Sequence, residues 1–312
     1  MNEYIKQTID SHYSEEFIRE KLYLILTSFL KYYGEDIVNL LVSTIRSTNI
    51  YLCYPHQDFQ RFINLKLNIS MDNYYNKYLN SDIINQSNGL SYTETSYVIY
   101  DEDTKEFINK GADRKIIFIK MPNQRNGLDD RNSYDEIIRI LIHEFIIRMK
   151  SCKNASIIRN SKKINRCGVM QSFYKLQKTD EGLVDVSYIS ESGRGFTMAT
   201  SEIETEQIFE MVCGHELSNI SYPLEVYLMK KILVDEELEK QINKAELYGN
   251  IPDLRAYFDD KYYDGSFDNL IKLLDEVITS GYRQNEDVYT KYKNDIANYL
   301  DSLKGVTKKY EG

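Results

Sequence analysis

A chain of 312 residues is long enough for one large domain or two moderate ones with an apolar core. Its 42% apolar and 28% charged residues are ordinary for a globular protein, and its net charge of −9 disfavours non-specific binding to nucleic acid or to an anionic membrane surface. The polar N-terminus and the lack of a long apolar run predict a cytoplasmic protein without a signal peptide or a transmembrane segment.

The first 90 residues are expected to form a mainly helical region. Apolar residues recur at helical spacing over Glu15–Tyr33, and Gly34 is a favourable residue to end that helix. A second helix is expected over Glu35–Arg46. Shorter helices are expected over Phe59–Leu67 and Asp72–Leu79.

Residues 91–121 change to the alternation that is typical of strands. The segments SYVIYD and KEFINKG predict a hairpin, and the β-branched run Lys115–Met121 predicts a third strand. A helix is then expected over Ser133–Ser151, because Ser133 followed by Glu136 has the spacing of a capping box. A further hairpin is expected to pair Ile157–Arg159 with Ile164–Arg166.

From Ser201 onward the pattern is nearly all helical. Helices are expected over Ser201–Met211, Tyr222–Leu247, Ser266–Ile278 and Asp287–Leu303. The acidic run in the first of them is expected to face solvent; its members are Glu202, Glu204, Glu206 and Glu210. The whole pattern predicts an α+β protein with a mainly helical region over residues 1–90, a core of strands and helices over 91–212 and a helical C-terminal subdomain over 213–312.

The helix expected over Ser133–Ser151 carries a pair of residues with metallopeptidase chemistry. His143 and Glu144 are the first two residues of the zinc-binding pattern H-E-x-x-H, in which the second histidine binds the ion one helical turn later. In this chain Ile147 occupies the place of that second histidine, and isoleucine cannot bind a metal ion. A His-Glu pair alone is a weak signal, and His143 as a buried structural histidine is the plain alternative.

Downstream, the segment EGLVD places two carboxylates four residues apart. On a short helix Glu181 and Asp185 would face the same way. The order HEFII, hairpin and EGLVD resembles the HExxH…ExxxD arrangement of gluzincin metallopeptidases, and in particular a group of bacterial metallopeptidase-like proteins. The resemblance covers about residues 115–211 and implies a zincin-like core, that is, a small sheet with an active-site helix.

The resemblance implies roles for four residues. His143 and Glu181 would bind zinc, Asp185 would hold the ring N–H of His143, and Glu144 would act as the general base. Because Ile147 leaves one ligand position empty, we expect no zinc or weakly bound zinc, and a degenerate peptidase that binds a peptide or protein in the former substrate cleft. The strand expected over Lys115–Met121 would be the edge that receives that peptide.

Two other functions stay open from the sequence. One is an active metal-dependent peptidase with an atypical third ligand; the other is an interaction protein in which the His-Glu pair is accidental.

His215, within CGHE, is a poorly placed substitute ligand, and His12 and His56 are poorer still. A nucleophilic pair of Cys213 or Cys167 with His143 lacks a residue to orient it. The sequence does not determine the oligomeric state.

Overall fold

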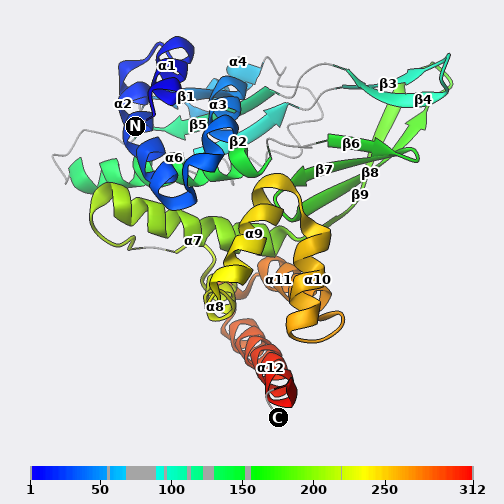
Figure 1. Ribbon diagram of the computed structural model, residues 1–312. Helices are drawn as coiled ribbons and strands as arrows, with labels where there is room; N and C mark the ends of the chain where they lie inside the picture. The colour runs from blue at the N-terminus through cyan, green and yellow to red at the C-terminus, as the bar shows by residue number, and fades with distance from the viewer. Residues whose placement is uncertain are drawn as a thin grey trace. The chain divides into compact units, whose positions relative to one another are not determined.

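Helices and small β-sheets combine in this protein, as the α+β prediction expected (Figure 1). The computed structural model describes residues 2–54, 57–67, 89–94, 97–110, 114–121, 130–151, 156–218 and 220–310. The chain divides into two units. Unit 1 comprises Met1–Ser96, Gly111–Arg148 and Gln207–Glu216; unit 2 comprises Tyr97–Lys110, Met149–Glu206 and Leu217–Gly312. The division into regions 1–90, 91–212 and 213–312 stays a prediction.

Unit 1 begins with a helical segment and continues into a three-stranded sheet. Its elements are α1 (Glu3–His12), α2 (Glu16–Tyr33), the short 3-10 helix η1 (Glu35–Ile37), α3 (Val38–Ser47), β1 (Thr48–Cys53), α4 (Phe59–Leu67), β2 (Gly89–Glu94), β5 (Arg114–Lys120) and most of α6 (Asp130–Lys150). The predictions of α2, α3 and α4 are confirmed, and Gly34 ends α2 with a left-handed φ of 86°. The helix expected over Asp72–Leu79 lies outside the described residues.

Strand β5 lies in the middle of the sheet of unit 1. It pairs in parallel with β1 and antiparallel with β2, so that both of its edges are already hydrogen-bonded. The prediction that Lys115–Met121 forms a free edge for a peptide is therefore wrong. The sequence does not predict this pairing, because β1 follows α3 directly, with no turn residue between them.

Helix α6 follows β5 in the sequence and begins before the expected capping residue. Its first residue is Asp130, so Ser133 lies inside the helix, three residues after its start. The apolar residues of α6 are buried on several sides of the helix, and Phe145 makes an edge-on contact with Phe29 of α2, with ring centroids 6.1 Å apart. This contact packs α6 against α2 in unit 1.

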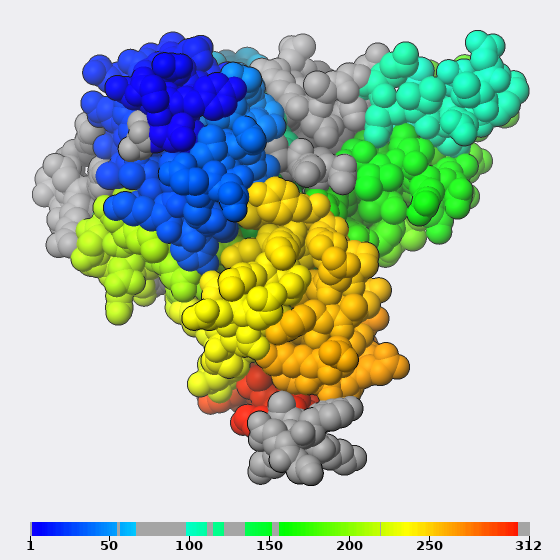
Figure 2. Space-filling view, viewed as in Figure 1, coloured from blue at the N-terminus to red at the C-terminus, as the bar shows by residue number. Residues whose placement is uncertain are grey.

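Unit 2 contains a four-stranded antiparallel sheet in the order β6-β7-β8-β9. Its strands are β6 (Ser156–Arg159), β7 (Lys162–Cys167), β8 (Met170–Lys178) and β9 (Val184–Ser192). The predicted β6–β7 hairpin is confirmed, with Ile157 opposite Ile164. The second predicted hairpin, β3 (Tyr97–Asp101) with β4 (Glu106–Lys110), is also confirmed and lies against this sheet (Figure 2).

The segment EGLVD forms a hairpin turn, so the prediction of a short helix is wrong. Thr179 closes the turn, because its N–H donates to the Leu183 carbonyl at 2.9 Å and its Oγ1 accepts from the Leu183 N–H at 3.1 Å. Gly182 has a left-handed φ of 79°, and Asp185 already belongs to β9. Alternating β-branched and aromatic residues after Leu183 favour a strand over a helix.

The rest of unit 2 is helical. It contains most of α7 (Arg194–Cys213), then α8 (Pro223–Ile232), α9 (Glu236–Tyr248), α10 (Ile251–Lys261), α11 (Ser266–Thr279), the 3-10 helix η4 (Tyr282–Gln284) and α12 (Glu286–Tyr310). α7 begins at Arg194, before Ser201, where the sequence predicts its start. The single helix expected over Tyr222–Leu247 is two helices, because Asp235 caps α9 by accepting from the Glu237 and Leu238 N–H groups. None of the described helices combines the length and apolar composition needed to cross a membrane.

A buried ion cluster joins the elements of unit 2 and corrects one prediction. The fully buried Lys150 ammonium group lies 3.0 Å from Glu204 and 3.2 Å from Glu246, and it donates to the hydroxyls of Thr200 and Ser201 at 3.0 Å each. The acidic run of α7 therefore does not all face solvent, since Glu204 and its neighbour Glu202 are buried. The partners come from distant segments, which a local charge pattern cannot show.

Candidate metal centre

The His-Glu pair lies on α6 in unit 1, as the sequence predicted. Both His143 and Glu144 are partly exposed, whereas Ile147, one turn further on, is buried with 8% of its surface exposed. The helix therefore presents an imidazole and a carboxyl group with an apolar side chain in the position of the second zinc ligand.

Glu181 and Asp185 lie in the exposed β8–β9 hairpin of unit 2. The Asp185 carboxylate accepts a hydrogen bond from the Ser187 hydroxyl at 3.0 Å, and neither carboxylate is on a helix. Because neither residue is on a helix, their spacing of four residues does not place the two carboxylates on one helix face. A zinc site formed by His143 and Glu181 stays a prediction.

A different set of side chains comes together in unit 1. Asp135 near the start of α6, Cys213 at the end of α7 and His215 just after it bring one ligand atom each within 4.8 Å of one another. Among the described residues this is the one group of three or more such side chains close enough to hold a metal ion. The end of α7 lies beside the N-terminal half of α6, which is what brings the three together (Figure 1).

The two ring nitrogens of His215 have different neighbours. Nδ1 lies 3.1 Å from the backbone carbonyl of Glu216, and Nε2 lies 3.1 Å from Oδ2 of Asp135. An Nδ1–H that donates to a carbonyl leaves Nε2 with a lone pair, the tautomer of most metal-binding histidines. That lone pair then faces a carboxylate oxygen, an arrangement that requires a cation or a proton between them.

The spacing suits a small divalent ion. Two ligand atoms at about 2.0 Å from a tetrahedral zinc ion are roughly 3.3 Å apart, close to the 3.1 Å between Nε2 and Oδ2. A thiolate, an imidazole and a carboxylate are the ligands that zinc prefers, whereas Ca²⁺ and Mg²⁺ prefer oxygen alone. The His215 and Asp135 side chains are 30% and 18% exposed, so a fourth position on the ion would be reachable from solvent.

The geometry disfavours a cysteine-protease type of triad. In such a triad one imidazole nitrogen faces the acidic residue and the other accepts the thiol proton. Here the nitrogen that does not face Asp135 is 3.1 Å from the Glu216 carbonyl. The Phe209 ring contacts the imidazole edge-on, with centroids 5.4 Å apart, and further fixes its orientation.

Sequence reasoning missed this group because its members are far apart in the chain. Cys213 and His215 form a C-x-H pair at a helix end, which is a signal for metal binding but a weak one. Asp135 lies 78 residues before Cys213 and has no motif of its own. The packing of α7 against α6 was needed to identify the site.

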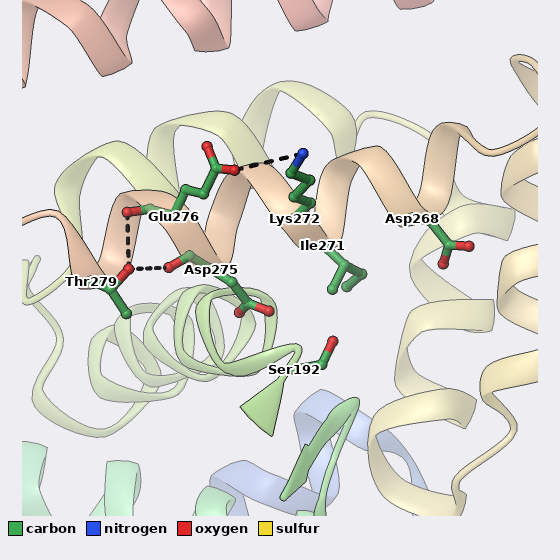
Figure 3. Close-up of a pocket in the computed structure, with 7 residues that line it drawn as sticks. All are labelled: Ser192, Asp268, Ile271, Lys272, Asp275, Glu276 and Thr279. Carbon is green, nitrogen blue, oxygen red and sulfur yellow. Dashed lines mark hydrogen bonds and ion pairs between the residues drawn. The ribbon is translucent and has the colours of Figure 1, made fainter. Parts of the chain in front are cut away.

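A groove of about 530 Å³ in unit 2 is a weaker candidate (Figure 3). Its acidic side chains already have partners. Asp268 pairs with Arg255 at 2.9 Å and Glu276 with Lys272 at 3.9 Å. Figure 3 shows the Asp275 carboxyl group on the side of α11 that faces Ser192, where it accepts from the Gly193 and Gly195 N–H groups and caps α7. These contacts are structural.

Comparisons with protein-family models, with curated proteins and with solved structures found no match to this chain. The function proposed below therefore rests on the geometry of the residues.

Proposed function

We propose that this protein binds a zinc-class divalent metal ion through Asp135, Cys213 and His215. The observation that carries the proposal is the pair of contacts made by His215, with Nδ1 directed at a backbone carbonyl and Nε2 at a carboxylate. The Cys213 thiol lies close enough to supply a third ligand.

Three protein ligands and one open position are the arrangement of catalytic zinc sites, whereas structural zinc sites usually have four protein ligands. The open position would hold water or an oxygen atom of a substrate. A zinc ion lowers the pKa of such a water to about 7, which makes hydroxide available at neutral pH. Hydrolysis by metal-bound water is the reaction class that this site supports.

Cobalt substitution tests the ligand set directly. Co²⁺ added to chelator-treated protein is expected to give the near-ultraviolet charge-transfer band of a cobalt–thiolate bond. Cys213→Ser should abolish this band, and Asp135→Asn should weaken cobalt binding by about tenfold or more. Cys167→Ser, which removes a buried thiol of unit 2, is the matched control and should keep the band. Absence of cobalt binding, or an unchanged band in Cys213→Ser, would contradict the proposal.

Descent from a metallopeptidase is a second candidate, supported by the partly exposed His143 and Glu144 on α6. Its test is Ile147→His, which would complete the H-E-x-x-H pattern on one face of the helix. If the scaffold is a degenerate peptidase, this variant should bind one more zinc ion per chain than the wild type. No gain in a folded variant would count against that descent.

A further inference from the structure

A second pocket, of about 270 Å³, lies in unit 2 where η4 meets the start of α7 and α8. Its volume is smaller than the 300–1,000 Å³ that is typical of sites for drug-sized ligands, so it suits a small molecule. Glu225 and Tyr282 line its buried side, and the guanidinium groups of Arg194 and Arg283 lie among its more exposed residues. Carboxylate and guanidinium groups thus line one pocket.

The Glu225 side chain is the unusual feature of this pocket. The residue is fully buried, and its Oε2 accepts a hydrogen bond from the Tyr282 hydroxyl at 2.7 Å. Its Oε1 has no hydrogen-bond partner among the described residues. A buried carboxylate with an unsatisfied oxygen is costly, and in native proteins such a group usually has a functional explanation.

The charges around Glu225 leave room for a cation. Burial raises the pKa of Glu225, and the hydrogen bond from Tyr282 offsets part of this rise, with a smaller contribution from the charge of Arg283. Burial and the bond to Glu225 raise the pKa of Tyr282 to about 12, so its hydroxyl stays a donor at neutral pH. Arg283 itself lies over the rings of Tyr222, at 5.0 Å, and Tyr282, at 5.8 Å, which holds a positive charge among the residues that line the pocket.

We propose that this pocket binds a free α-amino acid. Glu225 receives the ammonium group through Oε1, and Arg283 with Arg194 receives the carboxylate. Arg194 is available for this role because its contact with Glu191 is long, at 3.8 Å, and its side chain is 54% exposed. Ile278 and the ring of Tyr222 provide apolar walls, which favour a small or aliphatic side chain.

A simple amine or a simple anion fits less well. An amine would leave the two guanidinium groups without a negatively charged partner. An anion would be repelled by the Glu225 carboxylate. A zwitterion satisfies both signs of charge and the unsatisfied oxygen at once. The proposal is independent of the metal centre, which lies in unit 1.

Saturation-transfer NMR and calorimetry with glycine, L-alanine and L-valine test the ligand class. L-alanine is expected to bind, whereas ethylamine, which lacks the carboxylate, and N-acetyl-L-alanine, which lacks the ammonium group, should bind at least about tenfold more weakly. Loss of one charged hydrogen bond has this effect. Binding of none of the three amino acids, or equal binding of ethylamine and L-alanine, would overturn the proposal.

Variants of the full chain test the residues. Glu225→Gln keeps an acceptor for Tyr282 and should lose L-alanine binding while keeping the fold. Arg283→Gln, at an exposed position, should weaken binding by about tenfold or more. Arg255→Gln removes a guanidinium group outside the pocket and should leave binding unchanged. Unchanged binding in Arg283→Gln, or an equal loss in Arg255→Gln, would contradict the assignment.

The pH dependence of stability gives a second readout for Glu225. A carboxyl group whose pKa is raised by folding binds its proton more tightly in the folded state, so its contribution to stability falls as pH rises above the ordinary value of 4.5. Glu225→Gln should remove this fall, and ligand-free Glu225→Gln should be no less stable than the wild type at neutral pH. A large loss of stability at neutral pH would show that the charged carboxylate has a structural role and would overturn its assignment as a ligand group.

Discussion

Lys150, at the end of α6, forms buried ion pairs that connect α6 with two other helices. Its ammonium group lies between Glu204 of α7 and Glu246 of α9 with no exposed surface. Burial by itself lowers the pKa of Lys150, but the two carboxylates outweigh it, and the pKa is raised. A lysine with a raised pKa contributes stability that is present below its ordinary pKa of 10.5 and is lost only at still higher pH.

Lys150→Met is therefore expected to destabilise the protein by about 3–5 kcal/mol, because it leaves two buried carboxylates without their counter-charge. Denaturant unfolding at neutral pH measures the change. Lys230→Met is the matched control, since Lys230 pairs with Glu206 of the same helix α7 but is half exposed. The control should cost within about 1 kcal/mol. Equal effects of the two substitutions would contradict this interpretation of the cluster.

At the scale of elements, two helices of unit 2, α9 and α11, have a glycine with a left-handed backbone at one end. Gly249 ends α9 with a left-handed φ of 79°, and a Cβ atom there would lie 1.2 Å from Nη1 of Arg166. Gly265, before α11, has a similar φ of 80° but open space around it. A side chain at either position would strain the backbone. Only at Gly249 would it also clash with another residue.

Gly249→Ala is expected to destabilise the protein more than Gly265→Ala does. Gly265→Ala should cost about 1–2 kcal/mol, the strain of a left-handed alanine. Gly249→Ala adds the displacement of a buried guanidinium group, so its loss of stability should exceed that value clearly. Thermal or denaturant unfolding of both variants gives the comparison, and an equal loss would mean that Arg166 moves aside freely.

The sequence predicted those elements whose periodicity is local. The helices α2, α4 and α11 and the hairpins β3–β4 and β6–β7 were expected at nearly their observed positions, because apolar spacing and turn residues determine them. The EGLVD segment was assigned wrongly because its carboxylate spacing matched a helical motif, while the turn at Gly182 was overlooked. The early start of α6 shows that a favourable cap residue does not prevent a helix from beginning upstream of it.

The sequence predicted metal-binding residue types for the candidate site but not the residues that come together there. The sequence predicts a degenerate zinc site on this helix, with no zinc or weakly bound zinc, and α6 does supply a ligand candidate. That residue is Asp135, however, two turns before His143, and its partners Cys213 and His215 come from the end of α7. Contacts between helices that are distant in sequence determine this grouping, and no pattern within either helix reports them.

At the scale of the whole molecule, the two units carry different chemistry. Unit 1 holds the candidate metal centre, and unit 2 holds the buried ion cluster and the pocket around Glu225. Each proposed site consists of residues of one unit only. Metal binding and amino-acid binding can therefore be tested separately in the full chain, and failure of one leaves the other unaffected.

The zinc content of the purified protein, compared between His215→Ala and His143→Ala, shows which histidine binds the metal ion. After equilibration with zinc and removal of excess metal, one zinc ion per chain is expected in the wild type and in His143→Ala. His215→Ala is expected to lose that ion. An active zinc site at the His-Glu motif predicts the opposite dependence. Zinc that is retained in His215→Ala and lost in His143→Ala, or no zinc in the wild type, would contradict the metal centre proposed for Asp135, Cys213 and His215.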